Sequence, residues 1–156
     1  YWKDVGTIDS LWDANMDLLD PNVPLELYDK SWKIYARNNA LPPHYIGSKA
    51  HVENSMITEG CNVDGDVDFS VLYSGVTVEE GAKVEYSIVM PGAVIKSGAV
   101  VEYAIVGSDC VIESGAHIGA KPETMENRDD WGIAVVGHNN IIAEGQTVAP
   151  KEIYDK

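Results

Sequence analysis

The sequence contains no run of about 18 consecutive apolar residues, the length that a membrane-spanning helix needs, so we expect no transmembrane segment. Its start, Tyr1-Trp2-Lys3-Asp4, also lacks the charged-then-apolar pattern of a secretory signal peptide. No initiator methionine precedes these residues. We therefore interpret the chain as a piece that begins partway through a larger protein.

Basic residues are scarce. The 156 residues include 11 Lys and Arg against 25 Asp and Glu, which gives a net charge of −14. Nucleic acids and anionic membranes are bound through basic patches, so this balance argues against both as partners. The simplest interpretation of the acidity is a well-solvated surface.

The sequence is rich in a short aliphatic repeat. From Ile46 to Ile118 an aliphatic residue returns about every five or six positions, and the pattern resumes from Val136 to Val148. A helix repeats every 3.6 residues and a strand every two, so this period fits neither. It is typical of a solenoid, in which each short face points one side chain toward a common axis.

Two further sets of positions support a solenoid. The residue two before each aliphatic should also face inward, because side chains alternate along a strand. These residues are small with one exception, Val76, and the set is Ala50, Ser55, Cys61, Gly65, Ser70, Ala82, Ser87, Ala93, Ala99, Ala104, Cys110 and Ala116. Three positions after an aliphatic stand residues that tolerate a left-handed corner: Gly60, Gly75, Gly81, Gly92, Gly98, Asp109, Gly115, Asn139 and Gly145. Lys49 departs from this second pattern.

Segments of five, six and six residues make a coil of 17 residues, as from Val67 to Val84 and from Val84 to Val101. Three faces per coil predict a mainly β protein built as a triangular parallel β-helix. The spacing does not give its hand. Similarity to hexapeptide-repeat proteins implies a left-handed coil, an exception to the usual right-handed crossover.

Cysteine is also rare, with only Cys61 and Cys110. Both occupy small inward positions, so we expect them to fill the core rather than to react. They lie too far apart in the stack of coils for a disulfide, which favours a cytoplasmic protein. No pair of residues has the spacing of a metal site.

We expect three regions along the chain. Residues 1–19 form a strand end, a turn and a helix, which Thr7 or Asp9 caps and which ends at Leu19. Residues 20–45 are a connector, in which residues 32–35 could form a short strand. Residues 46–156 are the β-helix domain, with a polar loop at 120–132 that interrupts the repeat and a polar tail after Val148.

The N-terminal segment carries a more specific signal. The stretch Tyr-Trp-Lys-Asp-Val-Gly-Thr-Ile at residues 1–8, followed by Trp12 and Ala-Asn-Met-Asp-Leu-Leu at residues 14–19, resembles the ADP-glucose pyrophosphorylases, the glucose-1-phosphate adenylyltransferases of bacterial glycogen synthesis. The similarity continues through residues 32–35, Pro42-Pro43, the solenoid and residues 132–136. It implies that residues 1–19 end a truncated nucleotidyltransferase domain, and that the solenoid serves structure, oligomer assembly and allostery.

The resemblance also implies roles for individual residues. Asp4 matches a carboxylate that holds Mg²⁺ against the phosphates of ATP, and Trp2 matches a residue that lines the glucose-1-phosphate pocket. The other catalytic parts of the family are missing, including the glycine-rich nucleotide loop and the sugar-binding lysine. We therefore expect no catalytic residue in this chain and no catalysis by the chain alone.

Regulation is a further implication of the resemblance. Many family members are tetramers that bind sugar-phosphate effectors between the catalytic domain and the solenoid. Arg128 falls in the loop where the family places an effector-contacting arginine, and a guanidinium suits a phosphate. Glu126, Asp129 and Asp130 oppose such binding by charge repulsion. A second effector position of the family is Ser97 here, which departs from the arginine.

Two alternatives stay open. The first is a non-catalytic regulatory subunit on the same scaffold, against which the carboxylate of Asp4 argues. The second is a hexapeptide-repeat acyltransferase, which would use a histidine as general base in a cleft between subunits. His51 and His117 precede inward aliphatics and His138 lies in a corner sequence, so we expect all three at the surface; His44 is a fourth formal candidate.

Overall fold

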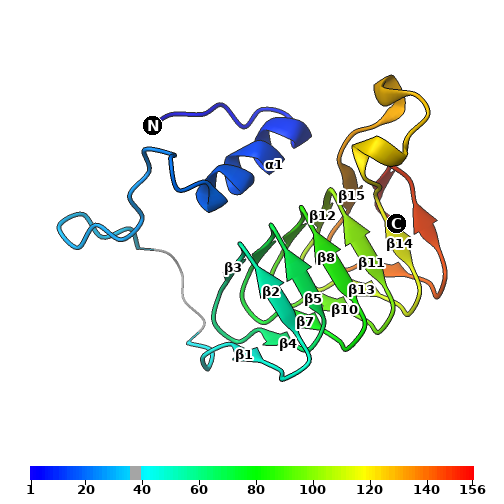
Figure 1. Ribbon diagram of the computed structural model, residues 1–156, viewed down its shortest axis with the longest axis horizontal. Helices are drawn as coiled ribbons and strands as arrows, with labels where there is room; N and C mark the ends of the chain where they lie inside the picture. The colour runs from blue at the N-terminus through cyan, green and yellow to red at the C-terminus, as the bar shows by residue number, and fades with distance from the viewer. Residues whose placement is uncertain (36–39) are drawn as a thin grey trace.

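The computed structural model describes residues 1–35 and 40–156. Within these residues, 18 short strands form three parallel sheets of six strands each (Figure 1). The first sheet contains β1 (Tyr45–Ile46), β4 (Asn62–Val63), β7 (Thr77–Val78), β10 (Val94–Ile95), β13 (Val111–Ile112) and β16 (Ile141–Ile142). The second contains β2 (His51–Glu53), β5 (Asp66–Asp68), β8 (Lys83–Glu85), β11 (Val100–Glu102), β14 (His117–Ile118) and β17 (Thr147–Val148). The third contains β3 (Met56–Ile57), β6 (Val71–Leu72), β9 (Ile88–Val89), β12 (Ala104–Val106), β15 (Ala134–Val136) and β18 (Ile153–Tyr154).

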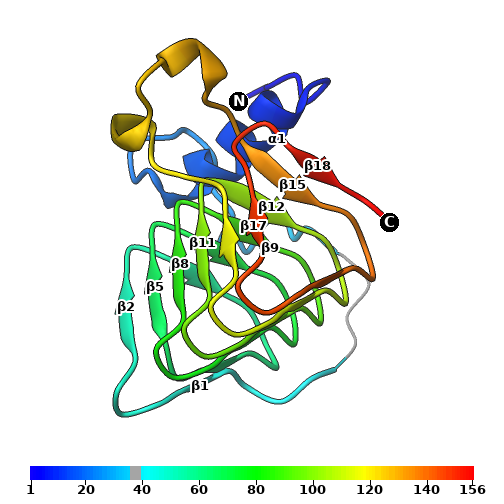
Figure 2. The ribbon, with the colours of Figure 1, turned by 90° about the vertical axis from the view of Figure 1, so that its right-hand side faces the viewer.

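The chain visits the three sheets in turn, so each coil contributes one strand to each side of a triangular prism (Figure 2). The parallel β-solenoid predicted from the period is confirmed. The left-handed sense stays what the family resemblance implies. No helix in the described parts of the chain is long and apolar enough to cross a lipid bilayer.

Successive coils stack in register. Ile95 pairs with Val78 below it and with Ile112 above it, and all three side chains are fully buried. The small inward residues lie in the same core cluster, including Cys61 and Cys110, which are buried free thiols. Burial raises the pKa of both thiols, which keeps them protonated and unreactive. The interpretation of both cysteines as core residues is therefore confirmed.

The predicted left-handed corners are also confirmed. All nine glycine, aspartate and asparagine positions of the pattern have positive φ, between 57° at Asp109 and 81° at Gly81. A second series of left-handed corners was not predicted. It lies between the second and third sheets, where Phe69, Tyr86 and Tyr103 have φ of 41°, 48° and 47°.

One coil is shorter than the repeat predicts. Between Val63 and Val67 the interval is four residues, so β4 pairs with β7 only 15 positions later. The shortened corner brings Gly65 close to the next coil. A Cβ at Gly65 would lie 2.6 Å from the carbonyl oxygens of Glu79 and Ala82, so only glycine fits there.

Two local expectations were wrong. Residues 32–35 form no strand and expose Trp32, Ile34 and Tyr35. The end of the chain is not merely a polar tail, because β18 pairs in parallel with β15 and completes the third sheet. The residues at 120–132 leave the solenoid after β14 and contain two short 3₁₀ helices, η2 (Pro122–Thr124) and η3 (Arg128–Asp130).

The N-terminal helix α1 spans Ile8–Met16 and continues as the 3₁₀ helix η1 (Asp17–Leu19). Thr7 is its N-cap, as expected. The Thr7 hydroxyl accepts a hydrogen bond from the Ser10 amide, and the Ser10 hydroxyl accepts one from the Thr7 amide. This reciprocal capping fixes the turn at which residues 1–6 enter the helix.

Substitutions in β16 test which residues face the core. Ile142 is fully buried, whereas its neighbour Ile141 is 63% exposed on the opposite face. We expect Ile142→Ala to lower the free energy of unfolding by about 2–5 kcal/mol, because it leaves a cavity in the core. The matched change Ile141→Ala should cost less than about 1 kcal/mol. Urea denaturation measures both, and equal losses would contradict the assigned faces.

Candidate functional site at the junction of helix and solenoid

Residues 1–6, where a strand end was expected, form no strand in the structure and precede α1 as an irregular segment. This N-terminal segment carries the two residues that the resemblance singled out. Trp2 is 85% exposed and Asp4 is also exposed. One carboxylate oxygen of Asp4 accepts a hydrogen bond from the Gly6 amide at 3.1 Å, which holds the side chain beside the turn into α1. Both side chains are thus available to solvent or to another part of a longer protein.

Asp17 joins the N-terminal segment to helix α1 by hydrogen bonds. A single carboxylate oxygen of Asp17 accepts hydrogen bonds from the Tyr1 hydroxyl at 2.6 Å and from the Lys3 ammonium at 2.7 Å. These bonds lower the pKa of Asp17, the Lys3 contact being the larger cause. The same carboxylate raises the pKa of Lys3 and that of Tyr1. All three groups therefore keep their ordinary charge at neutral pH.

Helix α1 lies along the outer face of the third sheet (Figure 1). The outward residues of three successive coils, Val71, Ile88 and Ile105, pack with Met16 and Leu19 in a second apolar cluster, separate from the solenoid core. All five side chains are buried. Each contributes roughly 1.5–3 kcal/mol by burial, so the helix and the solenoid form one packed body.

Trp12 is the specific contact of this interface. Its indole nitrogen donates to the Tyr86 carbonyl at 2.8 Å, and its ring lies 5.8 Å from the Tyr103 ring. Tyr86 stacks in parallel on Tyr103 at 4.7 Å, and Phe69 lies 4.9 Å from Tyr86. We call Phe69, Tyr86 and Tyr103 the aromatic ladder. It lies on the left-handed corners described above.

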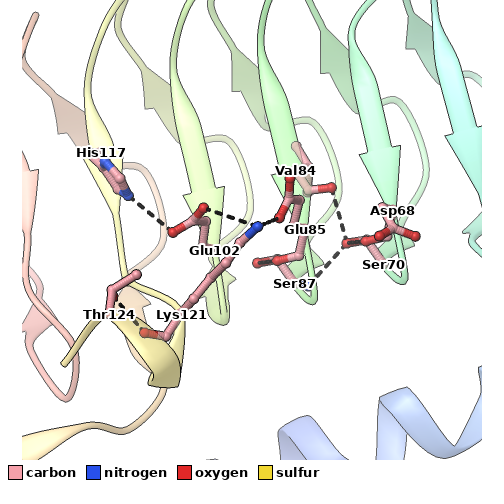
Figure 3. Close-up of polar contacts among 9 residues, drawn as sticks. All are labelled: Asp68, Ser70, Val84, Glu85, Ser87, Glu102, His117, Lys121 and Thr124. Carbon is pink, nitrogen blue, oxygen red and sulfur yellow. Dashed lines mark hydrogen bonds and ion pairs between the residues drawn. The ribbon is translucent and has the colours of Figure 1, made fainter.

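A left-handed backbone is costly for a bulky residue, about 1–2 kcal/mol each. Ring stacking offsets part of this cost. So do the buried serines of the same corner, shown in Figure 3. The Ser70 hydroxyl accepts from the Ser87 amide, and the Ser87 hydroxyl accepts from the Ala104 amide, both at 3.1 Å. Each serine thus bonds an amide of the following coil.

The loop at 120–132 is anchored beside this corner. Acidic residues stack in register on the second sheet, and Lys121 at the start of the loop bridges Glu85 and Glu102 (Figure 3). His117 lies 3.3 Å from Glu102 on the other side. The Glu85 carboxylate raises the pKa of Lys121, so the ammonium stays charged and offsets the repulsion between the carboxylates.

The far end of the loop closes onto the solenoid and helix. The Trp131 indole donates to the Ala120 carbonyl at 2.7 Å, and its ring meets the Tyr103 ring edge to face. A cavity of about 370 Å³ lies between this loop and the start of α1. It is lined by Ile8, Asp9, Trp131, Gly132, Ile133 and Lys151.

The predicted effector residue Arg128 and Ser97, which replaces the family's other effector arginine, fall at different places. Arg128 is exposed in η3, in the loop that borders this cavity, although its side chain does not line it. Ser97 lies at a corner between the first and second sheets, where its amide and hydroxyl bond to Glu79 and Glu80. The loop leaves from a different corner, so the structure does not bring Ser97 and Arg128 together as one site.

The residues described here offer no complete metal site. Asp4 is the single candidate ligand, and no group of three or more His, Cys, Asp or Glu side chains in the described ranges is placed to hold a metal ion. His51, His117 and His138 are exposed, as expected, and His44 is exposed as well. The chain by itself therefore does not fit a bound Mg²⁺, which would need ligands from elsewhere.

Comparison with known proteins decides the family. Residues 43–141 match the model described as "GlmU-like, C-terminal hexapeptide". The chain belongs to this family. Over 84 residues, 54% of the chain, it is 60% identical to proteins named glucose-1-phosphate adenylyltransferase from Bacillus mycoides (strain KBAB4), Bacillus cereus (strain Q1) and Bacillus thuringiensis (strain Al Hakam). The match covers 22% of each relative, so the chain spans about a fifth of their length.

Sequence reasoning missed several residues of this junction. The recurrence of an aromatic at 69, 86 and 103, 17 positions apart, could have shown the aromatic ladder. A carboxylate at the C-terminal end of α1, where the helix dipole disfavours negative charge, could have drawn attention to Asp17. The partners of Lys121 left no local signal, because they lie one and two coils earlier.

Removing the Trp12 side chain tests the docking of the helix. We expect Trp12→Ala to lose about 2–4 kcal/mol of docking free energy, because it removes a large, partly buried ring and leaves the Tyr86 carbonyl without its donor. Amide hydrogen exchange should then rise in α1 while the solenoid strands stay protected. Trp32→Ala is the control, since that ring is 81% exposed. Loss of protection throughout the solenoid would contradict a separate docking interface.

Proposed function

We propose that this chain is the C-terminal part of a glucose-1-phosphate adenylyltransferase, which converts ATP and glucose-1-phosphate to ADP-glucose and pyrophosphate in glycogen synthesis. The observation that carries this proposal is the 60% identity over 84 residues to proteins of that name. The Trp-Lys-Asp-Val-Gly-Thr segment supports it as well, because an acyltransferase, the alternative on the same scaffold, has no use for such a segment.

In this proposal the solenoid is a scaffold. The long packed core, the two inert thiols and the surface histidines carry no recognisable chemistry. The face of the third sheet, by contrast, holds helix α1 through an apolar cluster and a specific indole contact. The scaffold would hold the end of the catalytic domain in place and contribute to a homotetramer.

In the N-terminal segment, Asp4 would be a Mg²⁺ ligand and Trp2 would form part of the sugar pocket. Both residues are exposed, as such roles require. Mg²⁺ would neutralise phosphate charge when bound. Asp4 would supply one carboxylate, and the remaining ligands, together with the nucleotide site, would come from residues outside this chain.

The proposed regulatory site is the junction. Arg128 would contact an anionic sugar phosphate, supported by its place in a loop beside the cavity that Trp131 and Lys151 line. Glu126, Asp129 and Asp130 lie close to it in the sequence and oppose an anion by charge repulsion, so Lys151 in the cavity lining would have to add its positive charge to that of Arg128.

Activity of the longer parent protein tests the enzyme proposal. We expect the parent to form ADP-glucose with Mg²⁺, and the 156-residue chain to form none. Asp4→Asn in the parent should lower kcat/KM by about 100-fold, because it removes a charge that acts on the phosphates. Asp13→Asn, an exposed carboxylate on α1, should stay near wild type. Binding of coenzyme A measured by calorimetry, without ADP-glucose formation, would favour an acyltransferase instead.

Substitution of Arg128 tests the regulatory proposal. We expect Arg128→Ala to raise the concentration of activating sugar phosphate needed for half-maximal effect about tenfold, the value of one lost charge-assisted hydrogen bond. Basal activity should not change. Lys33→Ala, which removes an exposed positive charge of the connector, is the matched control. An activation curve that Arg128→Ala leaves in place would remove this residue from the effector site.

A further inference from the structure

The carboxylate of Asp17 occupies an unfavourable place. It lies at the C-terminal end of α1, where the helix dipole is negative, and the last turn of α1 contains no basic residue. The positive charge that compensates it comes instead from Lys3, 14 positions earlier. A residue that breaks a local rule in this way commonly serves another purpose.

The lengths of the two segments explain why this contact can form. Four extended residues from Lys3 to Thr7 span about 13 Å. Ten helical residues from Thr7 to Asp17 rise about 15 Å. The N-terminal segment therefore runs back along the helix from the capped turn at Thr7, and Figure 1 shows it beside α1. Lys3 and Tyr1 reach the far end of the helix at Asp17.

Asp17 bonds alternate residues of the N-terminal segment, Tyr1 and Lys3, so both side chains lie on the side that faces the helix. Where a chain is extended, neighbouring side chains point to opposite sides, which directs Trp2 and Asp4 away from Asp17. Lys3 is half-buried, whereas Trp2 and Asp4 are exposed. Tyr1, at the end of the segment, is 56% exposed although its hydroxyl reaches Asp17. A cavity of about 470 Å³ beside the connector is lined by Tyr1 but not by Trp2 or Asp4.

We propose that Asp17 is a positioning residue: by holding Tyr1 and Lys3 against helix α1, it turns Trp2 and Asp4 to the opposite face, toward sugar phosphate and metal. This inference rests on the proposed function for its final step. That Asp17 holds the N-terminal segment on the helix follows from the hydrogen-bond geometry alone. Because α1 packs on the solenoid through Trp12 and Met16, Asp17 also fixes the orientation of the segment relative to the solenoid.

NMR relaxation of the 156-residue chain tests whether Asp17 holds the N-terminal segment. We expect Asp17→Asn and Lys3→Met each to lower the backbone order parameters of residues 2–5 to below about 0.6, the range of a flexible segment, because the hydrogen bonds to Asp17 are lost. The double variant should lower them no further than Asp17→Asn alone. Asp13 lies one turn earlier on α1 and acts on Lys3 through charge alone, so Asp13→Asn should leave the order parameters near their wild-type values. Unchanged order parameters in Asp17→Asn would overturn the proposal.

Kinetics of the parent protein test the positioning. We expect Asp17→Asn to raise the KM for glucose-1-phosphate and the Mg²⁺ concentration for half-maximal rate about fivefold. A smaller fraction of the molecules would then hold the N-terminal segment in the orientation that binds these ligands. The charge-swapped variant Lys3→Asp with Asp17→Lys should recover part of this loss. Lower order parameters with unchanged kinetics would show that Asp17 holds the N-terminal segment on the helix without positioning Trp2 and Asp4. A wild-type parent that makes no ADP-glucose would refute the proposed function, while the order parameters would still decide whether Asp17 holds the segment.

Discussion

In-register stacking of one coil on the next governs this structure. Backbone hydrogen bonds run from each strand to the strand of the following coil, as from the Val94 amide to the Cys110 carbonyl. Since most coils have 17 residues, a residue type that returns at this interval forms a column along the solenoid. The aliphatic core, the serines, the aromatic ladder and the acidic column are all results of this one constraint. The columns of aliphatic residues form only the packed core, whereas the columns of aromatic and acidic residues at the surface make specific contacts with the helix and the loop.

Those contacts gather at the corner between the second and third sheets. There, Tyr86 and Tyr103 adopt a strained backbone, serines bond the next coil, and Lys121 anchors the loop to stacked carboxylates. Trp12 and Trp131 both reach Tyr103, one from the helix and one from the loop. The Tyr103 ring therefore contacts both the helix that follows the N-terminal segment and the loop that contains Arg128. This contact gives a physical route between the proposed catalytic and regulatory ends.

The fold was predictable because its signals are local and repeated. The period gave the solenoid, and the glycine and asparagine positions gave one set of corners, since few other residues tolerate positive φ. The aromatic corners at Phe69, Tyr86 and Tyr103 contradict residue preference and depend on stacking between coils, which a single coil does not display. The contacts of Asp17 and Lys121 join residues distant in sequence, so only the folded chain reveals them. The roles of Trp2, Asp4 and Arg128 came from family resemblance and stay predictions, because their partners would lie outside this chain.

The length of α1 has a consequence for how such a protein could change during evolution. Nine helical residues rise about 13.5 Å, and coils stack about 4.8 Å apart, so the helix matches three coils. The buried outward residues of three successive coils, Val71, Ile88 and Ile105, lie in the cluster with the helix, and Ile133, Met56 and Val135 extend it to the neighbouring coils. Insertion of a coil between Tyr86 and Tyr103 would separate the Tyr86 carbonyl, which Trp12 contacts, from the Tyr103 ring, which Trp12 and Trp131 share. We therefore expect the number of coils between the contacts of the helix and those of the loop to be fixed, whereas coils added at either end of the stack would leave these contacts in place.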